Sequence, residues 1–544
     1  MHQRHRAKYL LIYFVFQITT IFSQTTTDLN STSLPLVVID THGSTIIDGQ
    51  KIKADMKLIF NDPDKPNKPD EPGNIYQGNI GIEIRGAYSA SLPQKPYGIE
   101  TRDASGANLN VSLLGMPAEN AWILLAVYND KTFMRNMLAF DLFRRMGHYA
   151  SQTRVVEVII NNQYQGIYIL TEKIKQDKGR VDIAKLTNLD VAGDELTGGY
   201  IFKIDFFNQW NSWKSNYTQI GYPDKIVNYV FQDPDVSDLM PQQKEYLKSA
   251  LNSFETVLYS ANFKDPNTGY PAWINVNSFI DYFIVNELSR NVDGFKKSVY
   301  FFKDKDSKGG KINAGPVWDF DWAWKNIWDC PAFQATDGSG WSYKINDCLT
   351  YAPYSNGWTV RFLQDENFAN TLNSRYFELR KSFLSTQYLN SYIDSVQTLV
   401  NEAQVRHYNK WRILGISVGA PEVGSQPDSY AGVLYKFKNW IETRLNWLDK
   451  NMPGKTIATS AEPFEIADNY RIFPNPASDL VYIESAAKIN TIELFQLNGT
   501  CVFRNSGISV YSGKIEISNY PSGIYFLHLK RANKSTIVSK IVIQ

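Results

Sequence analysis

The 544-residue chain is too long to fold around a single hydrophobic core, so we expect two or three domains. Aromatic residues make up 14% of it, which argues against a disordered protein. Its 56 Lys and Arg against 55 Asp and Glu leave no basic surplus, so composition gives no reason to expect nucleic acid or an anionic membrane as a partner.

The N-terminus is typical of an export signal. Basic residues precede a mostly apolar run over residues 9–22, and the small Ser23 suits cleavage, so we expect a signal peptide over residues 1–23. The run is short for a membrane-spanning helix and contains polar residues. We expect no transmembrane segment after cleavage, because no other stretch is a candidate.

Residues 36–205 are predicted to form a β-rich lobe with one helix. Apolar alternation and turn residues predict strands at 36–39, 52–60, 80–84, 97–101, 155–160, 167–170 and 199–205. The helix is predicted over 131–146, where Asp130 can cap the first turn and Gly147 ends the pattern.

From about residue 240 the pattern becomes helical. Periodic apolar residues predict helices at 242–258, 279–288, 362–384, 389–405 and 434–451, interrupted by a Gly- and Pro-containing loop at 415–428. A β-rich lobe followed by a helical lobe over about 240–450 predicts a bilobal α+β domain with a ligand cleft between the lobes.

The C-terminal residues are predicted to form a separate domain after a linker. Residues 452–469 have the composition of a linker. Short strands are predicted at 480–484, 491–496, 501–504, 514–517, 523–529 and 535–542. Their spacing predicts a small all-β, immunoglobulin-like sandwich over 470–544.

The stretch 291–325 carries acids among apolar residues. Asp293 lies in a Gly-containing turn, and Asp319 and Asp321 stand among Val, Phe and Trp residues. Such carboxylates are costly to bury unless they are paired, hydrogen-bonded or bound to a cation. Their spacing is that of a phosphotransferase site with a hard divalent cation. The alternative, that Asp319 and Asp321 only cap a turn, stays open from this stretch alone.

The cysteines and histidines give weaker signals. Cys330 and Cys348 flank a loop and could pair in an oxidising compartment or remain free thiols, while Cys501 stands alone. The six His show no metal-ligand spacing, so we do not expect a zinc site.

Several segments occur in the order typical of one family. They are IEIRGAYSASLPQKPYGIET (82–101), NDKTFMRNMLAFDLF (129–143), GIYILTEKIKQDKGRVDI (166–183), GGYIFKID (198–205), NVDGFKKSVYFFKD (291–304) and GPVWDFDWAW (315–324). With them, residues 36–450 resemble the spore coat protein H (CotH-type) family of atypical secreted protein kinases. The resemblance implies a kinase-like bilobal fold. It also implies transfer of phosphate from ATP, with Mg²⁺ or Mn²⁺, to Ser or Thr of an exported or surface protein.

The resemblance also implies roles for individual residues. Lys95 would contact the ATP phosphates, and Asp293 would orient the attacking hydroxyl as the catalytic-loop acid. Asp319 would bind the metal, with Asp321 as a second candidate. Arg85 could orient the phosphates or the loop, or could be only an outward strand charge.

Two positions depart from the ordinary kinase pattern. The predicted helix contains no Glu to pair with the phosphate-binding Lys, so Glu172 or Glu83 could serve instead. Ser298 stands where the family carries a metal-binding Asn. A hydroxyl binds Mg²⁺ less strongly than an amide carbonyl, so a weak kinase or a pseudokinase is an alternative.

Two other classes of function stay open. Trp318, Trp322, Trp324, Trp328 and Trp341 would suit glycan stacking in a non-catalytic surface protein, or simple core packing. A metal-dependent hydrolase is weaker, since no His or Ser–His arrangement supports it.

The C-terminal part carries its own set of segments. They are YRIFPNPASDLVYIE (470–484), IELFQLNGTCV (492–502), YPSGIYFLHL (520–529) and the terminal KIVIQ. They resemble the sorting domain of type IX secretion cargo in Bacteroidota. The resemblance implies handling by the type IX secretion machinery and a secreted protein, either extracellular or attached to the cell surface.

Overall fold

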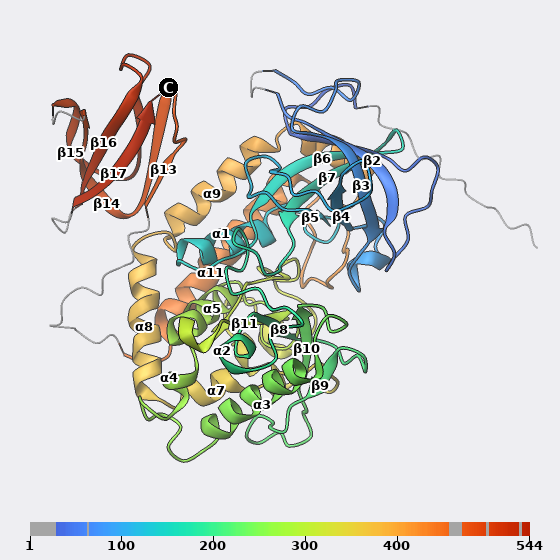
Figure 1. Ribbon diagram of the computed structural model, residues 1–544, viewed down its shortest axis with the longest axis vertical. Helices are drawn as coiled ribbons and strands as arrows, with labels where there is room; N and C mark the ends of the chain where they lie inside the picture. The colour runs from blue at the N-terminus through green and yellow to red at the C-terminus, as the bar shows by residue number, and fades with distance from the viewer. Residues whose placement is uncertain (1–28, 62–64, 456–469, 497–499, 532–535, 544) are drawn as a thin grey trace, which may run out of the picture.

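The computed structural model describes residues 29–61, 65–455, 470–496, 500–531 and 536–543 (Figure 1). The predicted signal peptide and most of the predicted linker lie outside these residues. Within the described part of the chain, no helix is both long and apolar enough to span a membrane.

Seven strands close into a barrel, at the upper right of Figure 1. In barrel order they are β1 (Leu36–Asp40), β2 (Ile52–Ile59), β3 (Tyr76–Ile84), β4 (Tyr97–Arg102), β5 (Ala121–Ala126), β7 (Gln163–Glu172) and β6 (Thr153–Ile160). Six of them match predicted strands. The exception is β5, whose AWILLA run lacks the alternation of a half-buried strand because four of its residues are buried in succession.

The strand predicted at 199–205 does not join this barrel, which ends at Glu172. It forms β8 (Tyr200–Ile204), the centre of a second sheet. The order of that sheet is β12 (Ile312–Ala314), β11 (Val299–Lys303), β8, β10 (Asn228–Asp233) and β9 (Ser212–Lys214). Because Ile204 pairs with Val299 in antiparallel register, the end of β8 lies beside the residues that precede β11.

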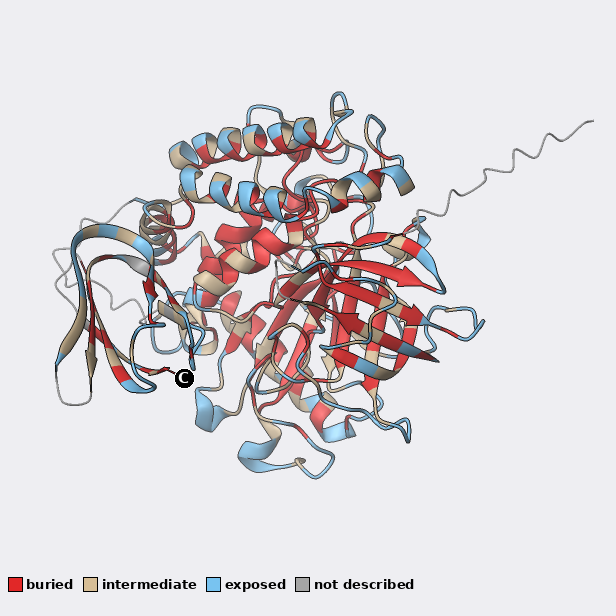
Figure 2. Cartoon of the chain, turned by 90° about the horizontal axis from the view of Figure 1, so that it is seen from above, coloured by how far each residue is buried: buried red, intermediate tan, exposed pale blue. Residues whose placement is uncertain are grey.

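The helices lie around this second sheet and beside the barrel (Figure 1). They are α1 (Arg135–Arg145), α2 (Gly193–Leu196), α3 (Pro241–Leu258), α4 (Tyr270–Trp273), α5 (Val276–Leu288), α6 (Pro331–Gln334), α7 (Trp358–Phe362), α8 (Glu366–Arg380), α9 (Thr386–Leu399), α10 (Ala403–Lys410) and α11 (Tyr430–Asn451). Figure 2 shows buried residues concentrated in the barrel and the central helices, whereas the outer helices keep an exposed face.

Capping side chains explain where two helices differ from the prediction. The predicted helix over 362–384 is divided, because the Asp365 carboxylate accepts the Asn367 N–H and starts α8. Helix α1 begins four residues later than predicted. The Asp130 carboxylate accepts the N–H groups of Thr132 and Arg135 and so holds the intervening residues in a turn.

The C-terminal strands form one connected sheet. They are β13 (Tyr470–Phe473), β14 (Leu480–Gln496), β15 (Cys501–Glu516), β16 (Gly523–Arg531) and β17 (Thr536–Ile543). The all-β prediction is confirmed, but two pairs of predicted strands are each one long strand. Since β14 pairs with β13, β15 and β16, the pairing shows a single sheet and not the two separate sheets of a sandwich.

Helix α10 docks on the barrel through a buried histidine. The backbone N–H of Ile167 in β7 donates to His407 Nδ1 at 3.1 Å. Gly166 has a φ of +94°, and a Cβ there would lie 2.8 Å from the same nitrogen, so only glycine fits. Burial and the nearby Lys410 lower the pKa of His407 from 6.5 to about 3, so the imidazole stays neutral in the folded protein.

We expect the stability that comes from docking α10 on β7 to depend on pH. Between pH 6.5 and about 3, His407 takes up a proton in the unfolded chain but not in the folded one. The free energy of unfolding should therefore fall as the pH falls through this window, by up to ~1.4 kcal/mol per pH unit. Above pH 6.5 His407 is neutral in both states, and its contribution to the free energy of unfolding is fully present.

Denaturant unfolding followed by Trp fluorescence at pH 7, 5 and 4 measures this effect. All 13 Trp precede residue 456, so the signal excludes the C-terminal sheet. His407→Asn keeps an acceptor for the Ile167 N–H but does not titrate. Its stability should fall less steeply with acidity than that of the wild type, and equal slopes would rule out the assignment.

Candidate functional site

The turn that carries Asp293 is fixed against α5 and the 319 segment. Asn291 Nδ2 donates to the Asp319 carbonyl at 3.1 Å, and Asn291 Oδ1 accepts the Asp293 N–H at 3.1 Å. A side chain at Gly294 would meet Asn286 Oδ1 at 2.1 Å, so the turn packs closely on the helix. One asparagine thus joins two acids that are 26 positions apart in the sequence.

Asp319 and Ser298 meet directly. Ser298 Oγ donates to Asp319 Oδ2 at 2.7 Å. Both residues have left-handed backbones, with φ of +59° at Asp319 and +53° at Ser298. Residues other than glycine adopt this conformation at a cost, and such strained positions cluster at functional sites.

The carboxylates here repel one another. Burial and the neighbouring Asp293 and Asp205 raise the pKa of Asp319, against the lowering effect of Lys297. Burial and Asp319 raise the pKa of Asp321 to about 6. Asp205, Asp293, Asp319 and Asp321 therefore form one group of acids, which we call the acidic cluster.

Two lysines form ion pairs with members of the acidic cluster. Lys297 Nζ lies 2.9 Å from Asp293 Oδ2. Lys203 Nζ lies 2.7 Å from Asp205 Oδ2 and 5.5 Å from the centre of the Tyr300 ring. No role was predicted for Lys203, Asp205 or Lys297 from the sequence. For Lys203 and Asp205 the available signal was the Lys-Ile-Asp end of an apolar strand, within a segment already tied to the family.

The loop from Arg85 to Lys95 covers the apolar neighbours of the acidic cluster. The Arg85 guanidinium lies 5.8 Å from the Trp318 ring, and the Tyr88 ring lies 5.5 Å from that of Trp322. Lys95 Nζ donates to the Ala90 carbonyl at 2.9 Å. Within the described residues, Lys95 therefore bonds its own loop and forms no ion pair with Asp293 or Asp319.

Glu172 is engaged elsewhere. Its Oε1 lies 2.6 Å from the Arg180 guanidinium in a fully buried ion pair, and its Oε2 accepts bonds from Tyr149 and Gln152. Glu83 lies 2.8 Å from Lys51. Neither glutamate contacts Lys95, so the structure does not bring together the Lys–Glu pair that the resemblance implies.

Most of the tryptophans that were candidates for glycan stacking pack in or against the hydrophobic core. Trp318 and Trp324 are buried, and Trp341 packs on Trp447 with ring centres 4.8 Å apart. Of the five predicted candidates for glycan stacking, Trp328 is the one whose side chain is largely exposed, at 59%. The possible pair of Cys330 and Cys348 forms a disulfide.

The donor atoms suit a hard cation that is shared with phosphates. The described residues contain no group of three or more His, Cys, Asp or Glu side chains that could hold a metal by themselves. Asp319, Asp321 and the Ser298 hydroxyl supply oxygen ligands, and the mutual repulsion of the two carboxylates would fall on binding a cation. Mg²⁺ is commonly bound by one or two carboxylates together with substrate phosphates, so these residues fit it.

Two family models match the chain. A family model described as CotH kinase protein matches residues 82–448. A second model, described as secretion system C-terminal sorting domain, matches residues 471–544. No curated protein matches the chain. The first match includes every residue of the acidic cluster, and the second includes the C-terminal sheet except its first residue, Tyr470.

Proposed function

Because the chain belongs to the CotH kinase family, we propose that it transfers the γ-phosphate of ATP to Ser or Thr of exported or surface proteins. The sorting domain marks it as a secreted or cell-surface protein handled by the type IX secretion machinery. The observation that carries the proposal is the acidic cluster. Three distant segments bring four carboxylates and two lysines together, and the backbone is strained at Asp319 and at its hydrogen-bond partner Ser298.

The chain's own residues supply most of the chemistry. Asp293 would orient the acceptor hydroxyl and take its proton as the oxygen–phosphorus bond forms and ADP leaves. Lys297 and Lys203 would compensate the charge on the phosphates. Asp319, Asp321 and Ser298 would hold Mg²⁺ or Mn²⁺, which when bound neutralises charge on the transferred group.

Labelled ATP tests the proposal. The full exported chain is incubated with labelled ATP, Mg²⁺ or Mn²⁺, and the exported proteins of the source cell, and modified residues are identified by mass spectrometry. We expect metal-dependent phosphate on Ser or Thr, either of the chain itself or of another protein. An Asp394→Asn variant, altered at an exposed carboxylate on α9, serves as the control and should behave as the wild type. No transfer under any of these conditions would overturn the proposal.

A catalytically weak or dead kinase-like surface protein, binding glycan or protein partners, is the second candidate function. It is favoured by the hydrogen bond of Ser298 to Asp319, which engages the hydroxyl, and by the bond of Lys95 to its own loop.

Replacing Ser298 by asparagine should strengthen the site. The left-handed backbone at position 298, with φ +53°, is one that asparagine tolerates better than serine. Its Nδ2 could keep the bond to Asp319 while its Oδ1 adds a ligand. We expect Ser298→Asn to lower the Mg²⁺ concentration for half-maximal transfer about tenfold, the effect of ~1.4 kcal/mol. A metal titration of transfer by both proteins measures this, and an unchanged or weaker dependence would show that position 298 is no ligand.

A further inference from the structure

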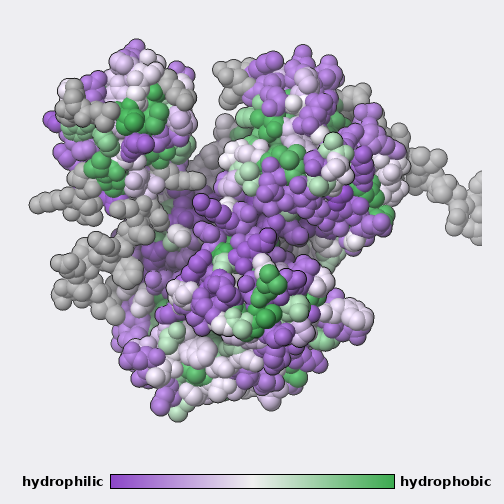
Figure 3. All heavy atoms as spheres, viewed as in Figure 1, coloured by the Kyte–Doolittle hydropathy of each residue, from purple (hydrophilic) through white to green (hydrophobic). Residues whose placement is uncertain are grey.

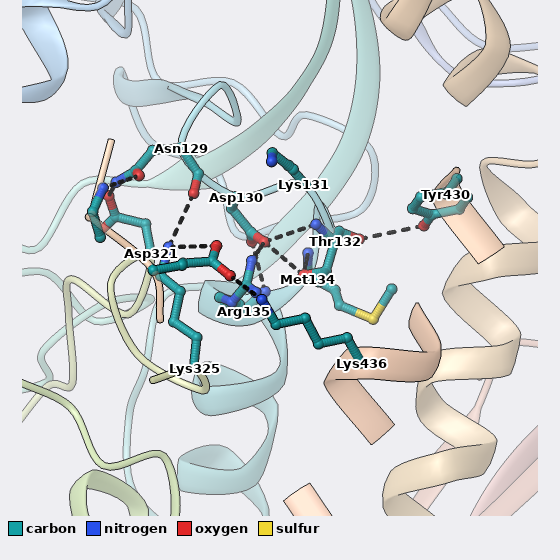
Figure 4. Close-up of polar contacts among 12 residues, drawn as sticks. Asn129, Asp130, Lys131, Thr132, Met134, Arg135, Asp321, Lys325, Tyr430 and Lys436 are labelled. Atoms are coloured by element: carbon teal, nitrogen blue, oxygen red, sulfur yellow. Dashed lines mark hydrogen bonds and ion pairs between the residues drawn. The ribbon is translucent and has the colours of Figure 1, made fainter. Parts of the chain in front are cut away.

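A buried amide beside Asp321 joins three distant parts of the chain (Figure 4). Asn129 lies between β5 and α1 and is 5% exposed. Its Nδ2 donates to Asp321 Oδ2 at 2.6 Å, and its Oδ1 accepts the Ala420 N–H at 3.1 Å. Because a backbone N–H can only donate, Ala420 fixes the orientation of the amide and directs Nδ2 to Asp321.

Ala420 belongs to the Gly- and Pro-containing loop over residues 415–428, which we call the strap. The strap runs beside the residues that follow Asp321. Trp328 N–H donates to the Pro421 carbonyl at 2.7 Å, and Val423 N–H donates to the Asn326 carbonyl at 2.9 Å. Gly419 has a φ of +64°, and a Cβ there would lie 1.6 Å from Asn129 Oδ1. Only glycine allows this approach.

Charged side chains hold the strap at other points. Glu422 lies 3.7 Å from Lys325 and 3.0 Å from Lys436. Lys131 Nζ donates to the Ile416 carbonyl at 2.5 Å. Figure 4 shows Lys131, Lys325 and Lys436 around the turn that precedes α1. The strap is therefore anchored independently of Asn129, and can act as its support.

We propose that Asn129 positions Asp321 as a ligand for a divalent cation, and that the strap sets the orientation of Asn129. The inference rests on the proposed metal site. Asp321 Oδ2 is held by the amide, whereas Asp321 Oδ1 has no hydrogen bond among the described residues and stays available to a cation. A residue that orients a metal ligand in this way acts through that ligand, and its loss typically weakens metal affinity 10- to 100-fold.

Mn²⁺ binding tests the role without relying on catalysis. The full exported chain is titrated with Mn²⁺, and free Mn²⁺ is measured by electron paramagnetic resonance. We expect Asn129→Leu to bind Mn²⁺ about 10- to 100-fold more weakly than the wild type. Gly419→Ala should give a similar loss, because the added methyl group displaces Asn129 Oδ1. The control is Asp394→Asn, which alters an exposed carboxylate on α9 that contacts neither the strap nor Asn129, and its affinity should stay within about twofold of the wild type. Melting curves establish that each variant is folded.

The outcomes separate this inference from the kinase proposal. Equal Mn²⁺ affinity in the wild type, Asn129→Leu and Gly419→Ala would overturn the role of Asn129, as would a wild type that binds no Mn²⁺. Should Asn129→Leu not fold, the comparison of Gly419→Ala with Asp394→Asn decides in the same way. If Mn²⁺ binding falls as expected but no protein transfers phosphate, the positioning role stands and the kinase proposal fails.

Discussion

Asp319→Asn is expected to abolish phosphoryl transfer without destabilising the fold. The replacement removes the carboxylate that the proposed metal site needs, and loss of one such stabilising group costs about 10²- to 10³-fold in rate. Asparagine tolerates the φ of +59°, and its Oδ1 can still accept the Ser298 hydroxyl. Burial and neighbouring acids already disfavour the charged form of Asp319, so the uncharged amide should leave the melting temperature unchanged or higher.

The measurement is a pair of experiments on the same preparation. Initial rates with labelled ATP give the loss of transfer, and melting followed by Trp fluorescence gives the stability. Loss of activity together with a large fall in melting temperature would indicate that Asp319 only supports the fold. Transfer at the wild-type rate would remove Asp319 from the mechanism.

Arg444→Met should cost about 3–5 kcal/mol of stability, the penalty for breaking one partner of a buried ion pair. Arg444 is fully buried in α11 and lies 3.0 Å from Glu287 Oε2, at the end of α5. It also donates to the carbonyls of Gly338 and Gly340, at 2.6 and 2.7 Å. Methionine fills similar space but leaves the carboxylate and both carbonyls without this donor.

Urea unfolding followed by Trp fluorescence measures the loss. Lys438→Met is the matched control, because it breaks a partly exposed ion pair with Asp394 on the protein surface and should cost less than about 1 kcal/mol. Combining Arg444→Met with Glu287→Gln should restore part of the stability, since the unpaired buried charge is then removed. If Arg444→Met and Lys438→Met lowered the free energy of unfolding equally, the buried ion pair would contribute no more to stability than the surface pair.

The sequence predicted the elements in which apolar residues alternate, as in strands, or recur with helical periodicity. Six barrel strands follow from apolar alternation, while β5 is missed because it is buried along most of its length. Periodicity located the regions of the long helices but not their breaks, since a single cap at Asp365 divides one predicted helix into two. The long strands β14 and β15 could not be foreseen, because their pairing with several neighbours is a property of the assembled sheet.

The candidate site shows the same division. Asp293, Asp319 and Ser298 stand in segments with a family signature, and the structure brings them together. Lys203, Asp205 and Asn129 also stand in family segments, but their roles depend on Tyr300, Asp319 and Asp321, which lie 97 or more positions away in the sequence. Lys95 and Glu172 carry the residue types that the family implies, but their observed partners are Ala90 and Arg180.

The central claim is that the acidic cluster is a metal-dependent nucleotide site. The most direct test is the melting temperature of the full exported chain, followed by Trp fluorescence, with ATP alone, Mg²⁺ alone and both together. A ligand that binds only the folded state raises this temperature. We predict a rise with ATP and Mg²⁺ together that exceeds the sum of the separate effects and is absent in Asp319→Asn. No rise, or the same rise in Asp319→Asn, would contradict the claim.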